Sequence, residues 1–135
     1  MLSEPQQSEG GTLTTEPRNP GIADRALLLE IAGGEAEARD VLTLYFTSAR
    51  DLMARCRDAA DQEDRDRLGH AAHQMAGAAG TCGFARAESR MRALEQAAAT
   101  ENWPELHARV DEVADLLGRI ESEARILFPQ PSPER

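Results

Sequence analysis

Apolar residues recur every three or four positions through most of the chain, and no segment has the alternating pattern of a strand. The clearest stretch spans about 35–60, where one stripe contains Leu42, Tyr45, Phe46, Ala49, Leu52, Met53 and Cys56. That spacing puts the apolar side chains on one face of an α-helix. We therefore predict a helix over about 35–60 with one buried face.

Four further helices are predicted by the same period, over about 23–31, 61–80, 84–99 and 102–127. Residues that favour helix ends support these bounds. Gly33 and Gly34 suit the end of the first helix, and Asn102 can cap the last, with Pro104 in its first turn. Long amphipathic helices joined by short connections pack against one another. The predicted fold is all-α, an antiparallel four-helix bundle with a short additional N-terminal helix.

Proline positions and composition set the expected domain limits. Six of the seven prolines lie near the two ends of the chain, and the first twenty residues have little to bury. We expect disordered tails over 1–20 and 129–135 and one folded bundle over 21–128.

Charge and composition exclude several classes of function. The net charge is −9, and all fifteen basic residues are arginine, which argues against nucleic-acid or polybasic membrane binding. We find neither a secretion signal nor an apolar run of membrane-spanning length. Cys56 and Cys82 have no metal or disulfide spacing, so we interpret both as reduced thiols. A cytoplasmic monomer is expected.

The predicted helix over 61–80 has an unusual outer face. At about 100° per residue, Leu68, Ala72, Met75 and Ala79 form its inward stripe, whereas His70, His73 and Gly77 face outward. Gly69, Gly77 and Gly80 together cost this helix roughly 2–3 kcal/mol relative to alanine. Close approach of a second macromolecule to His73 would explain that cost. A neutral imidazole is a nucleophile near pH 7, so His73 is a candidate for accepting a phosphoryl group.

Residues 73–84, HQMAGAAGTCGF, resemble the signature of histidine-containing phosphotransfer (HPt) domains, including the similar N-terminal domain of chemotaxis histidine kinases. Leu94-Glu95 falls where that family has a Leu-Glu pair, and the resemblance extends over about 22–127. It implies a phosphocarrier of a bacterial two-component phosphorelay, with His73 as phosphoacceptor and Gly77 as the clearance beside it.

The same resemblance implies the partners. They are the receiver domain of a response regulator, a hybrid histidine kinase, or both. It implies no cofactor in this chain, with Mg²⁺ expected only in the partner receiver domain, and no autonomous enzyme activity.

One position departs from the family pattern, because Ala76 stands where a lysine usually lies beside the phosphoryl group. We hypothesise that His70 or Arg86 supplies the missing charge. The predicted interaction surface consists of His70, His73, Gln74, Ala76, Gly77, Gly80, Thr81 and Arg86.

Three other interpretations compete with phosphotransfer. The bundle could bind a partner without transferring phosphate, which the missing lysine favours. His70 and His73 have a spacing that suits two metal ligands, but no third ligand is evident, so we predict no metal site. An autonomous kinase is excluded by the absence of a phosphate-binding loop with its lysine.

Overall fold

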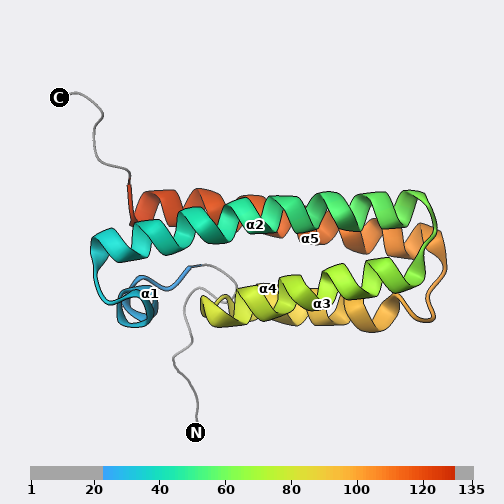
Figure 1. Ribbon diagram of the computed structural model, residues 1–135, viewed down its shortest axis with the longest axis horizontal. Helices are drawn as coiled ribbons and strands as arrows, with labels where there is room; N and C mark the ends of the chain where they lie inside the picture. Colours follow the sequence, from blue (N-terminus) through green and yellow to red (C-terminus); the bar gives the residue numbers. More distant parts are fainter. Residues whose placement is uncertain (1–22, 130–135) are drawn as a thin grey trace, which may run out of the picture.

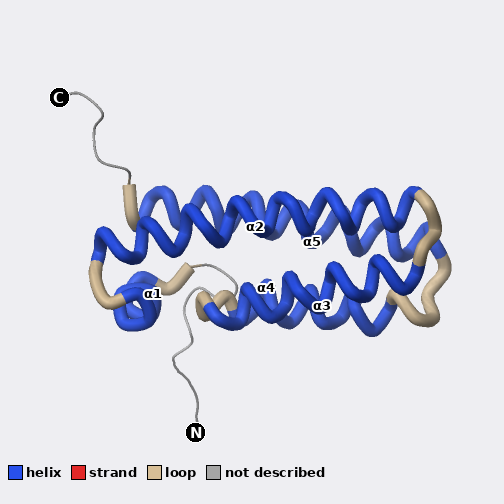
Figure 2. Tube along the Cα trace, viewed as in Figure 1, coloured by secondary structure: helices blue, strands red, loops and turns tan. Residues whose placement is uncertain are grey.

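The structure is a computed structural model that describes residues 23–129, and within that range it consists of five helices and no strand (Figure 2). The helices are α1 (Arg25–Ala32), α2 (Glu35–Asp61), α3 (Arg65–Thr81), α4 (Ala85–Ala97) and α5 (Trp103–Leu127). The predicted all-α bundle is confirmed. The tails predicted over 1–20 and 129–135 lie outside the described residues, apart from Pro129.

Four helices run side by side along the long axis, and α1 is seen end-on beside them (Figure 1). Helix α3 packs against α2 and α4, and α5 packs against the same two helices. The order around the bundle is therefore α2, α3, α4, α5, with α1 packed on α2. No described helix has the combination of length and apolarity that crossing a bilayer demands.

Side-chain caps set the start of three helices. Asp24 accepts a hydrogen bond from the Leu27 amide at 3.1 Å, and Asp64 accepts one from the Arg67 amide at 3.2 Å. Asn102 caps α5 as predicted, through a 3.0 Å bond from the Glu105 amide. Each cap satisfies an amide hydrogen that has no partner within the helix.

The turn between α3 and α4 requires a glycine. Gly83 has a φ of +76°, and a Cβ there would lie 2.4 Å from Leu27 Cδ2 of α1. The next residue, Phe84, is fully buried and packs edge-on against Tyr45 of α2, with ring centroids 5.1 Å apart. This turn therefore holds α3 and α4 as an antiparallel hairpin and fastens the hairpin to α1 and α2.

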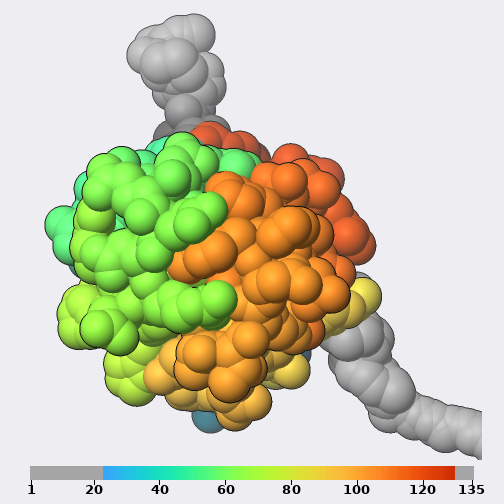
Figure 3. Space-filling view, turned by 90° about the vertical axis from the view of Figure 1, so that its right-hand side faces the viewer, coloured from blue at the N-terminus to red at the C-terminus, as the bar shows by residue number. Residues whose placement is uncertain are grey.

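Arg65 joins the connections at the opposite end of the bundle, where the green α2–α3 segment lies beside the orange α4–α5 segment (Figure 3). Its guanidinium donates to the carbonyls of Ala98 at 3.0 Å and Glu101 at 2.7 Å, and it lies 4.9 Å from the Trp103 ring centre. Both ends of the α3–α4 hairpin are thus fixed, which defines the register of the two helices.

Candidate functional site

His73 lies near the middle of α3, and 63% of its side chain is exposed. The residues predicted for the inward stripe of this helix, Leu68, Ala72, Met75 and Ala79, are all buried. The apolar period of α3 therefore predicted the orientation of His73 correctly. His73 faces solvent, and the apolar stripe on the other side of the helix is buried.

Within residues 23–129, the imidazole pairs with Glu95 of α4. His73 Nδ1 lies 3.0 Å from Glu95 Oε2, and the Glu95 side chain is 33% exposed. A carboxylate accepts hydrogen bonds, so this contact places the proton of the neutral ring on Nδ1. The lone pair of a neutral His73 is then on Nε2, the nitrogen available to an incoming electrophile.

Glu95 was not among the residues predicted for the site. The sequence contained one signal for it, since Leu94-Glu95 falls where the resembling family has a Leu-Glu pair. The structure adds that Leu94 is buried, which fixes the side of α4 on which Glu95 emerges. Which residue of α4 meets His73 depends on the register between two helices. The helical period within one segment does not contain that information.

The three glycines of α3 have different surroundings. A Cβ at Gly77 would meet nothing within 4 Å, so the space one turn beyond His73 is open. A Cβ at Gly80 would lie 3.0 Å from the Glu88 carboxylate, and one at Gly69 would lie 3.8 Å from the Ala98 methyl carbon. Gly69 and Gly80 therefore lie against α4, and partner approach alone does not explain them as the sequence had suggested.

Ala76 is fully buried, so its predicted place on the interaction surface is wrong. It lies about 60° around the helix from His73, toward the inward stripe. α4 packs closely on this side of α3, and the buried surface extends further around the helix than the apolar stripe alone indicates.

The other predicted surface residues are divided between two sides of α3. His70 and Gln74 line a shallow groove with Arg55 of α2, whereas His73 contacts α4. The Thr81 hydroxyl donates to the Gly77 carbonyl at 3.0 Å, one turn beyond the open space. Arg86 is exposed in the first turn of α4, nine residues before Glu95, or about 13 Å along the helix.

The cysteines offer no competing nucleophile. Cys56 and Cys82 are both buried, and burial raises the pKa of each thiol, that of Cys56 to about 11. Thiolate is the reactive form of cysteine, so both side chains are inert at neutral pH. Among the described residues, no group of three or more histidine, cysteine or acidic side chains is arranged to hold a metal ion.

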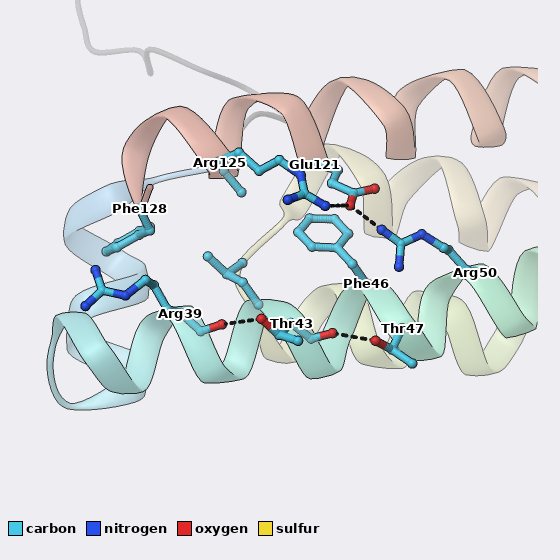
Figure 4. A pocket seen from close by; sticks show the side chains of 10 residues that line it. Arg39, Thr43, Phe46, Thr47, Arg50, Glu121, Arg125 and Phe128 are labelled. Atoms are coloured by element: carbon cyan, nitrogen blue, oxygen red, sulfur yellow. Dashed lines mark hydrogen bonds and ion pairs between the residues drawn. The ribbon is translucent and has the colours of Figure 1, made fainter. Parts of the chain in front are cut away.

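A separate groove lies between α2 and α5 (Figure 4). Arg50 of α2 pairs with Glu121 of α5 across it, Arg125 pairs with the same carboxylate from within α5, and Phe46 forms part of its floor. No residue of α3 or α4 lines this groove, and it contains neither histidine nor cysteine. Its Thr43 and Thr47 hydroxyls donate to backbone carbonyls, and its Glu121 carboxylate is paired with two arginines, so none of these groups is activated for group transfer. We therefore take the α3–α4 face as the candidate site.

Comparison with protein-family models finds that the Hpt domain matches residues 40–123, more than half of the chain. The matched range includes His73, Gly77 and Glu95. Comparisons with curated proteins and with solved structures gave no match.

Proposed function

Because the chain belongs to the Hpt domain family, whose members carry phosphoryl groups in phosphorelays, we propose that His73 is its phosphoacceptor. Hpt domains are not autonomous enzymes and need no cofactor, so the partner supplies the catalytic groups. The observation that supports His73 is its exposed imidazole, held at Nδ1 by Glu95 on a helix face left open by Gly77.

The transfer is a displacement at phosphorus. The Nε2 lone pair of His73 forms the N–P bond as the O–P bond of an aspartyl phosphate breaks, and the aspartate leaves as its carboxylate. The Nδ1 proton stays hydrogen-bonded to Glu95, whose negative charge offsets the positive charge that develops on the ring. The reverse displacement returns the phosphoryl group to an aspartate.

The partner is a receiver domain of a response regulator or of a hybrid histidine kinase, and Mg²⁺ would be bound in that domain. It would contact the face formed by His73, Gly77 and Thr81 of α3, with His70 and Gln74 at one edge. A bulky residue at Gly77 or Thr81 would obstruct approach to Nε2 of His73. We further propose that the chain acts as a monomeric shuttle in a bacterial cytoplasm.

Phosphate chemistry at His73 tests this function. The protein mixed with a phosphorylated receiver domain should gain phosphate that is labile in acid and stable in alkali, and His73→Gln should abolish the gain. His107→Gln is the matched control, because it changes an exposed histidine of α5 that lies outside the proposed contact face. Equal labelling of wild type and His73→Gln would overturn the assignment.

The same experiment separates phosphotransfer from a second function, in which the bundle only binds its partner. The specific observation in favour of that function is Ala76, since the lysine usual at this position is absent and Ala76 is buried. A pure binding module would associate with the receiver domain and gain no phosphate.

A further inference from the structure

Two contacts fix the register between α3 and α4. His73 lies opposite Glu95, at 3.0 Å, and a Cβ at Gly80 would lie 3.0 Å from the Glu88 carboxylate. Seven residues separate the two positions on each helix, about 10 Å of helix in both cases. The helices therefore stay aligned between these contacts. Halfway between them, Ala76 and Gly77 of α3 lie opposite the segment of α4 around Arg92.

Arg92 is the arginine of α4 that this register brings closest to His73. Its backbone lies three residues from Glu95, about 4.5 Å along the helix, which an extended arginine side chain can span. Arg90 points away and pairs with Glu112 of α5 at 2.8 Å. Arg86 lies a further six residues from the site, about 9 Å along α4.

The Arg92 guanidinium is partly exposed and bound to one carboxylate oxygen. Its Nε and Nη2 atoms lie 3.2 and 2.9 Å from Glu88 Oε2. The Arg92 and Glu88 side chains are 45% and 33% exposed, so water weakens this pair and its net stabilisation is small. A phosphoryl group carries more negative charge than a carboxylate and offers three acceptor oxygens, so it competes well for the same guanidinium.

Phosphorylation of His73 creates a need for such a cation. The new negative charge would lie beside the Glu95 carboxylate, and the residue at position 76 is an uncharged, buried alanine. We propose that the Arg92 guanidinium leaves the Glu88 carboxylate and binds the phosphoryl group when His73 is phosphorylated. Arg92 would thus supply from α4 the positive charge that α3 lacks at position 76. This inference rests on the proposed function of His73.

The test compares Arg92→Gln with Arg90→Gln, which removes the same charge from the same helix on the side facing α5. We would measure the equilibrium constant for phosphoryl exchange with a phosphorylated receiver domain, the half-life of the phosphohistidine and the KM for the receiver. Arg92→Gln should shift the equilibrium away from His73 by about three- to tenfold, with little change in KM. Arg92→Lys should restore most of the loss.

Glu88→Gln should shift the phosphoryl-exchange equilibrium in the opposite direction from Arg92→Gln. It removes the carboxylate that holds Arg92 and should shift the equilibrium toward His73. Equal constants for Arg92→Gln and Arg90→Gln, with both proteins folded by circular dichroism, would overturn the role of Arg92. In that case His73 still becomes phosphorylated, whereas a wild-type protein that gains no phosphate would instead refute the proposed function.

Discussion

Substitutions at Gly77 should change the stability of the fold and the rate of phosphoryl transfer in opposite directions. It is an exposed residue inside α3, and a Cβ there meets nothing within 4 Å. Alanine is favoured over glycine in a helix interior by about 0.8–1 kcal/mol, and here no steric cost reduces the gain. Gly77→Ala should therefore raise the free energy of unfolding by about 1 kcal/mol, or the thermal midpoint by roughly 4 °C.

Gly77→Leu should retain most of that stabilisation but slow phosphoryl transfer. Its side chain would project one turn from His73 into the space a receiver domain must enter. Overlap of this kind costs about 1–3 kcal/mol, which corresponds to transfer slower by roughly 5- to 150-fold.

Gly118 of α5 supplies the control, because a Cβ there also meets nothing within 4 Å and the residue lies outside the α3–α4 face. Gly118→Leu should raise the thermal midpoint, followed by circular dichroism, and leave the transfer rate unchanged. Wild-type transfer rates in Gly77→Leu would refute the idea that partner approach requires this open space. A lower midpoint in Gly77→Ala would refute the stability argument.

Two further predictions concern the bundle itself. Asn102→Ala should lower the free energy of unfolding by about 1 kcal/mol by removing the cap on the Glu105 amide, and an unchanged urea midpoint would contradict this. Burial raises the pKa of Cys56 to about 11, so the unfolded chain loses this proton first as pH rises and stability falls between about pH 9 and 11. The Cys56 contribution should reach about 1.4 kcal/mol at pH 10 and be absent below pH 8, measured as a larger alkaline drop in wild type than in Cys56→Ala.

The helices could be predicted from the sequence because their signals are local. The apolar period of α2 and the Asn102 cap depend on residues within one or two turns, and both agree with the structure. The exposure of His73 followed from the same reasoning. The burial of Ala76 did not, since its position at the edge of the stripe is decided by how closely α4 approaches.

The contacts around His73 required information that no single helix contains. Glu95 and Arg92 become relevant only when the register of α4 against α3 is known, and that register depends on the turn at Gly83 and on the Arg65 contacts. The sequence pointed to His70 and Arg86 as sources of charge because both were expected to lie near His73, whereas the register brings Arg92 nearer to His73 than Arg86. Distance along the chain is a poor guide across an antiparallel hairpin.

The short α3–α4 connection also bears on how the site forms during folding. His73 and Glu95 are only 22 residues apart, and the turn between their helices comprises three residues, so little chain entropy is lost in bringing them together. Contacts of such short sequence separation form quickly. The His73 imidazole and the Glu95 carboxylate can therefore meet within a single hairpin, before α5 closes the bundle. The backbone amides of this hairpin should accordingly become protected from hydrogen exchange early in refolding.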